Sequence, residues 1–75
     1  MFNIDANELR DRLITLIKDN EWRLTYIVDE TGICRQTLWR FFRQEPVMDL
    51  TLIKLENFTK RHEHIKELRK QNATI

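Results

Sequence analysis

Apolar side chains recur every three or four residues along most of this chain, which is the spacing of a helix that buries one face. The first such stripe consists of Leu9, Leu13, Leu16 and Ile17. Asp5 precedes it and can accept hydrogen bonds from the free N–H groups of an opening turn, while Glu8 adds a capping-box pattern. We therefore expect a first helix that begins near Asp5 and ends near residues 19–20.

A second, shorter helix is expected roughly from Leu24 to Thr31. Ile27 and Val28 are its inward positions. Gly32 follows directly, and glycine is the residue that most readily adopts the left-handed conformation that ends a helix. The pattern thus predicts a sharp turn at Gly32.

A third helix is expected to start after Cys34 and to run to about Arg43. Its predicted buried positions are Leu38 and either Phe41 or Phe42. Pro46 lies just beyond, and a helix normally ends before the residue that precedes a proline.

The C-terminal part predicts one or two further helices. Asp49 is a candidate cap for a fourth helix, whose apolar positions are Leu52, Ile53, Leu55 and Phe58. A fifth stretch, about His62 to Gln71, has only Ile65 and Leu68 as apolar contacts. The sequence leaves open whether this stretch breaks from the fourth helix or continues it. The predicted fold is all-α, a compact domain of four to five helices over residues 1–75.

Composition narrows the class of protein. Hydrophobic residues make up 41% of the 75 residues, while a single Gly and a single Pro leave too few turns for an all-β chain. A single Cys excludes an internal disulfide and a Cys-based zinc site within one chain. No apolar stretch approaches the ~18 residues of a membrane span, and the N-terminus does not resemble a signal peptide. We expect a cytoplasmic protein.

The net charge of +1 is uninformative, but the basic residues are grouped. The segment 33–43 carries three arginines and no acidic residue. The segment 60–70 carries five basic residues against two acidic ones, namely Lys60, Arg61, Lys66, Arg69 and Lys70 against Glu63 and Glu67. Any anion-binding surface is therefore expected on one side of the molecule.

The segment 24–43 has the residue types that a helix-turn-helix needs. A β-branched residue, Val28, lies where the two helices meet, and Gly32 lies where the backbone reverses. Ile33 follows the turn, and Leu38 and Phe41 anchor the second helix. Once these positions are buried, the remaining side of that helix faces outward and carries Arg35, Gln36, Trp39, Arg40 and Arg43. Arginine pairs bidentately with guanine, and glutamine pairs with adenine.

The stretch from Glu30 to Leu38 resembles the turn and recognition-helix start of the phage repressor and Cro proteins, the Xre-type family. The stretch from Thr51 to Leu55 resembles that family's fourth helix, and the likeness covers roughly Leu13 to Phe58. It implies a lambda-repressor-like fold, a homodimer on operator half-sites of double-stranded DNA, and transcriptional repression. The chain departs from the family at Cys34, a weak cap, and in the acidic segment 44–49.

The resemblance also assigns contacts. The family's base-contact positions fall on Arg35, Gln36 and Arg40. Trp39 is added as a fourth base-contact candidate because it faces outward on the same helix. Phosphate contacts are expected from Arg23, Thr25, Thr37 and Arg43.

Alternatives remain for each of these residues. The arginines and Gln36 can simply form a solvated helix face, and Trp39 can contact DNA, the core or a protein partner. Cys34 can be a redox switch or a small capping residue. The His62-Glu63-His64 run can suggest a metal, but alternating residues do not share a helix face. The basic residues of 60–70 can contact DNA backbone or, more in keeping with their spacing, form intrahelical pairs with Glu63 and Glu67. Ile65, Leu68 and Ile75 can form a dimer seam or cap the core.

Three functions are consistent with this pattern. The first is a sequence-specific DNA-binding regulator, a phage or mobile-element repressor that acts by operator occlusion. The second is a protein-interaction module on the same scaffold, an adaptor or inhibitor of a host factor. The third is an accessory DNA-bending factor in recombination. An enzyme is not expected, because the sequence has no nucleophile–base pairing, Gly-rich phosphate loop or metal cluster. No cofactor is expected.

Overall fold

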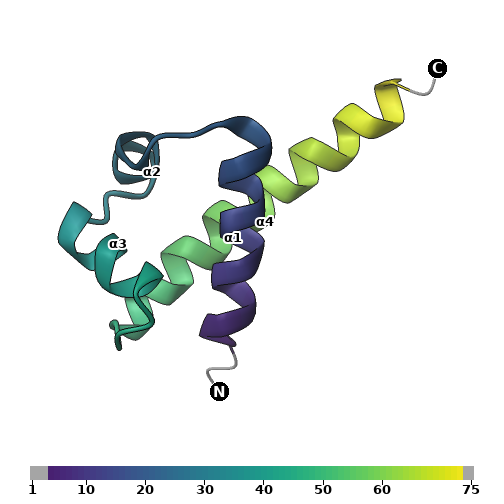
Figure 1. Cartoon of the computed structure of the whole chain (residues 1–75). Helices are drawn as coiled ribbons and strands as arrows, with labels where there is room; N and C mark the ends of the chain where they lie inside the picture. The colour runs from purple at the N-terminus through teal and green to yellow at the C-terminus, as the bar shows by residue number, and fades with distance from the viewer. Residues whose placement is uncertain (1–3, 74–75) are drawn as a thin grey trace.

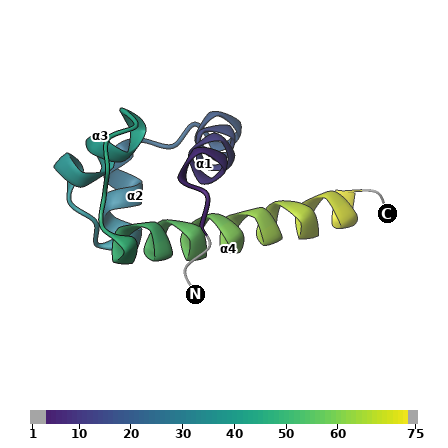
Figure 2. The same cartoon turned by 90° about the horizontal axis from the view of Figure 1, so that it is seen from below.

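Four α-helices and no strand make up residues 4–73, the part of the chain that the computed structural model describes; side chains are described for residues 4–69. The helices are α1 (Ala6–Asn20), α2 (Leu24–Thr31), α3 (Arg35–Phe42) and α4 (Asp49–Ala73). The expectation of a compact all-α fold is confirmed. Helices α1, α2 and α3 lie on one side of the long α4, whose C-terminal end extends beyond them (Figures 1 and 2).

Helix α1 begins and ends where its sequence predicts. The Asp5 carboxylate accepts hydrogen bonds from the backbone N–H of Asn7 at 2.9 Å and of Glu8 at 3.3 Å. The helix ends because Glu21 adopts the left-handed conformation, with φ of 55°, and its N–H donates to the carbonyl of Ile17. This reversal leads the chain into the short link that precedes α2.

The core lies between α4 and the other three helices. All four helices contribute side chains to one buried cluster. The buried cluster consists of Leu9, Leu13, Ile27, Ile33, Leu38, Phe41, Leu52, Leu55 and Phe58. Of the two phenylalanines proposed for α3, Phe41 is fully buried, whereas Phe42 is half-buried against the cluster.

Helix α4 is one continuous helix, which resolves the question of a fifth helix: the stretch 62–71 is its C-terminal part. Two details differ from expectation. Asp49 is the first helical residue rather than the cap, because the first helical bond runs from the Leu52 N–H to the carbonyl of Met48. Ile53, expected in the core, is exposed because its neighbours Leu52 and Leu55 occupy the inward face.

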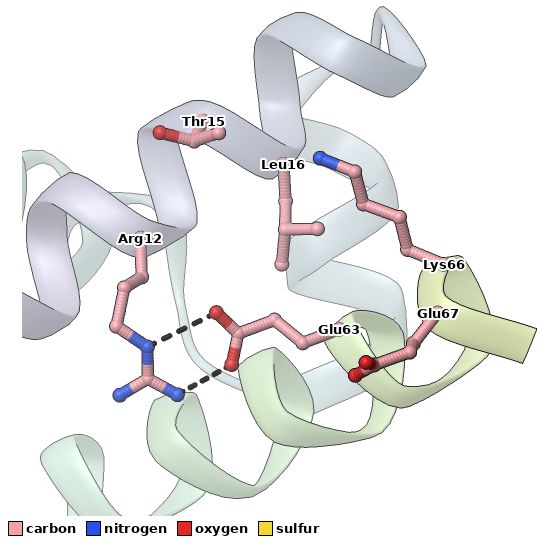
Figure 3. A pocket seen from close by; sticks show the side chains of 6 residues that line it. All are labelled: Arg12, Thr15, Leu16, Glu63, Lys66 and Glu67. Carbon is pink, nitrogen blue, oxygen red and sulfur yellow. Dashed lines mark hydrogen bonds and ion pairs between the residues drawn. The ribbon is translucent and has the colours of Figure 1, made fainter. Parts of the chain in front are cut away.

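Ion pairs hold α4 against α1 (Figure 3). The Arg12 guanidinium donates to both carboxylate oxygens of Glu63, at 3.1 and 2.6 Å, and also pairs with Glu56 at 3.1 Å. The bond from Arg12 holds the pKa of the Glu63 carboxyl below its usual range. Lys66 reaches Asp19 at the end of α1. Glu63 and Lys66 therefore pair across helices and not within α4 as expected, whereas Lys60 does pair within α4, with Glu56 at 3.5 Å.

Ile65 and Leu68 are both exposed on the extended part of α4. The side chains of Lys70 and Ile75, which were included in the charge and seam hypotheses, lie outside the described residues. No helix among the described residues is long and apolar enough to cross a membrane.

Candidate nucleic-acid interface

The turn between α2 and α3 is closed by three consecutive residues. Gly32 has φ of 73°, and its N–H donates to the carbonyl of Val28 at 2.9 Å. The Thr31 hydroxyl donates to the Ile27 carbonyl at 2.6 Å and accepts from the Ile33 N–H at 3.2 Å. Ile33 is buried below the turn. The predicted roles of Gly32 and Ile33 are confirmed, and Thr31 adds a side-chain bridge across the reversal.

The C-terminal end of α3 is fastened to α1 by Arg10. This side chain is 8% exposed, and its Nε donates to the Phe41 carbonyl at 2.6 Å. Its guanidinium carbon lies 5.0 Å from the centre of the Phe41 ring, and Nη1 donates to Asn7 Oδ1 at 2.8 Å. Arg10 thus contributes to the position of α3 although it lies outside segment 24–43.

Sequence reasoning missed Arg10. The signal available was its position directly beside Leu9 on the buried stripe of α1. An arginine at such a position also fits a solvated flank of the stripe, so this signal by itself did not predict a buried contact to α3.

The outward face of α3 is the one predicted. Arg35, Gln36, Trp39, Arg40 and Arg43 are all exposed, at positions that one side of a helix presents together. Trp39 is 51% exposed, so it does not cover the core. Between residues 33 and 43 this face carries no acidic side chain.

Four of these side chains line one shallow hollow with Glu45, namely Gln36, Trp39, Arg40 and Arg43. Glu45 approaches this face because Gln44 is left-handed, with φ of 66°, and the Glu45 N–H donates to the Arg40 carbonyl. Its carboxylate lies 3.5 Å from Arg43 Nε. Both groups are largely exposed, so this pair is weak and can be displaced.

The remaining predicted contact residues are less closely grouped. Arg23 and Thr25 are exposed at the start of α2, on a different element from the hollow. Thr37 is half-buried, and its hydroxyl lies 3.0 Å from Cys34 Sγ. This hydrogen bond lowers the pKa of the Cys34 thiol. Cys34 precedes α3 and makes no side-chain capping bond, as expected of a weak cap.

His62 belongs to an aromatic cluster. Its ring centre lies 4.5 Å from that of Phe58, 4.7 Å from Trp22 and 6.1 Å from Tyr26. Burial, with a smaller contribution from Arg61, lowers the pKa of His62, and its Nε2 atom is buried without a hydrogen-bond partner. No group of three or more His, Cys, Asp or Glu side chains among the described residues is placed to hold a metal ion.

Taken together, the exposed side of α3 is a cationic surface with one glutamine and one tryptophan, carried by a helix that Gly32, Ile33 and Arg10 hold from behind. Such a surface matches a polyanion that displays hydrogen-bonding groups. Comparison of the chain with models of protein families, with curated proteins and with solved structures finds no match.

Proposed function

We propose that this chain is a sequence-specific double-stranded DNA-binding regulator of the lambda-repressor-like helix-turn-helix type, in which α3 lies in the major groove. The observation that carries the proposal is the exposed face of α3, where Arg35, Gln36 and Arg40 project together from a helix whose other side is buried. Arginine and glutamine are the side chains that pair bidentately with guanine and adenine.

In this mechanism the contacts divide by role. Arg35, Gln36, Arg40 and Trp39 read base edges, whereas Arg43, Thr37 and the residues at the start of α2 contact phosphates and set the register. The chain binds as a homodimer to half-sites about one helical turn apart, and Ile65 and Leu68 on α4 offer an exposed apolar seam for the second copy. Occupation of the operator excludes polymerase, so the regulator acts as a repressor.

The decisive experiment is selection of bound sequences from a random DNA pool. We expect an enriched, pseudo-palindromic site. On that site Arg35→Ala should lower the affinity and relax the preference at one base pair. Arg43→Ala should weaken binding to all sequences alike, and the dependence of log affinity on log salt concentration should fall by the equivalent of about one phosphate contact. Arg61→Ala, which removes an exposed arginine from α4, is the matched control. Unchanged affinity and preference in Arg35→Ala would refute the groove assignment.

One specific observation favours a second candidate, a protein-interaction module. Trp39 is half exposed on the same face, and Glu45 neutralises Arg43 there, which suits a protein partner better than a phosphate. Absence of any DNA complex at low salt, together with a salt-insensitive protein complex lost in Trp39→Ala, would select this function instead.

A further inference from the structure

A second hollow shares Arg40 with the first, and its apolar lining residues take no part in the contacts proposed above. It is lined by Thr37 and Arg40 of α3, by Pro46, Val47 and Met48 of the link, and by Thr51 of α4. Met48 is 73% exposed, the highest value among the exposed large hydrophobic side chains of the described residues. An apolar side chain in this position remains in water unless something covers it.

The backbone explains why these apolar residues lie beside α3. The N–H groups of Arg43, Gln44 and Glu45 donate to the carbonyls of Trp39, Phe41 and Arg40, respectively. These bonds and the left-handed Gln44 turn the chain back at the end of α3, and the link to α4 then follows (Figure 1). Residues 46–48 consequently line a hollow together with α3 before α4 begins.

The hollow is continuous with the surface proposed to contact DNA. Arg40 lines both this hollow and the one that contains Gln36 and Trp39. The lining contains one cation, Arg40, and no carboxylate, because Glu45 is turned towards Arg43 on the other side. A ligand that brings hydrogen-bond acceptors to Arg40 therefore meets an apolar surface directly beside it.

In the major groove, the thymine C5-methyl is the apolar group that base edges display. A methyl group can be buried in this hollow against the apolar side chains of Pro46, Val47 and Met48. The cation and the apolar patch thus complement two neighbouring features of one DNA surface.

We propose that this hollow receives the C5-methyl of a thymine adjacent to the base that Arg40 contacts, with Met48 as the residue that selects thymine. This inference rests on the proposed DNA-binding function and adds a specificity position to it. Burial of one methyl group corresponds to about 0.8 kcal/mol, which is about a fourfold change in affinity.

The test replaces each thymine of the selected site, one at a time, by deoxyuridine, which lacks only the methyl group. At one position of the half-site, the substitution should weaken binding of the wild-type protein about fourfold. Met48→Ala should bind the unmodified site at that weaker level and should no longer distinguish thymine from deoxyuridine there. Leu50→Ala, which removes an apolar side chain that is 56% exposed but does not line the hollow, is the matched control and should keep the full discrimination.

The outcomes separate the two proposals. Failure of the wild-type protein to bind any DNA would refute both the function and this inference. Tight, sequence-specific binding that is insensitive to deoxyuridine, or a sensitivity that persists unchanged in Met48→Ala, would overturn only the methyl site. A loss of affinity in Met48→Ala that is equal for thymine and deoxyuridine would point to a sugar contact and would also overturn it. Because Met48 is exposed, circular dichroism of the variant should confirm an intact fold.

Discussion

Arg10→Met tests whether a buried arginine in the first helix holds the recognition helix in place. Methionine keeps most of the apolar stem but removes the guanidinium. The substitution deletes the 2.6 Å hydrogen bond from Nε to the Phe41 carbonyl and the cation–π contact with the Phe41 ring. The carbonyl keeps one donor, because the Gln44 N–H also reaches it at 3.2 Å. Asn7 Oδ1 also loses the bond from Arg10 Nη1, but Asn7 is exposed, so water can replace that donor.

The magnitude follows from these contacts. A hydrogen bond that involves a charged group contributes about 1.5–3 kcal/mol, and a cation–π contact contributes about 0.5–1 kcal/mol. Since methionine recovers part of the packing, we expect a loss of about 2–3 kcal/mol in the free energy of unfolding. For a domain of this size that corresponds to a fall in Tm of roughly 10–20 °C.

Thermal and urea denaturation, followed by circular dichroism, measure this loss. Arg61→Met makes the same chemical change at an exposed position of α4 and should alter stability by no more than about 0.5 kcal/mol. If Arg10→Met melts within a degree or two of the wild-type protein, the Arg10–Phe41 contact does not stabilise the fold and the reasoning is wrong.

Three further predictions concern the turn, the aromatic cluster and the recognition surface. Gly32→Ala should cost about 1–2 kcal/mol in urea denaturation, because φ of 73° strains any residue with a Cβ although no atom lies within 4 Å of the added methyl; a neutral or stabilising effect would contradict this. The lowered pKa of His62 means that the unfolded chain binds the proton more readily, so stability should be complete above pH of about 6.5 and should fall as the pH drops below it. His62→Phe should flatten this dependence between pH 7.5 and 5.5, and an equal slope in both proteins would exclude His62 as its source. If the chain binds DNA as proposed, Glu45→Gln should release Arg43, strengthen binding to all sequences and steepen the salt slope; no change would show that the pair is already open in the complex.

Local features of the chain were predictable because their causes are local. Asp5 caps the first helix through bonds to residues two and three positions away, and Gly32 ends the second through its own backbone freedom. The stripe of Leu9 and Leu13 depends only on helical spacing. Burial of Leu38 and Phe41 then left Arg35 and its outward neighbours on the opposite side, as expected.

What could not be predicted depends on which elements meet. Arg10 carries no mark in the sequence that distinguishes a buried anchor from a solvated arginine, because its partner is a carbonyl 31 residues away. Glu63 pairs with Arg12 and not within α4, because α1 and α4 bring a bidentate arginine to it. Glu45 of the acidic segment 44–49 approaches Arg43 because Gln44 adopts a positive φ, which the sequence does not mark with a glycine.

The sequence by itself therefore determined the helices, their inward faces and the sharp turn between α2 and α3, since periodicity, capping and glycine geometry act over a few residues. Tertiary structure alone decided that α4 is unbroken, that Arg10 supports α3, and that Met48 lies exposed in a hollow beside Arg40. The Arg10 contact joins residues 31 positions apart, and the hollow joins side chains from α3, the link and α4, so both depend on how these elements pack and not on a pattern within one of them.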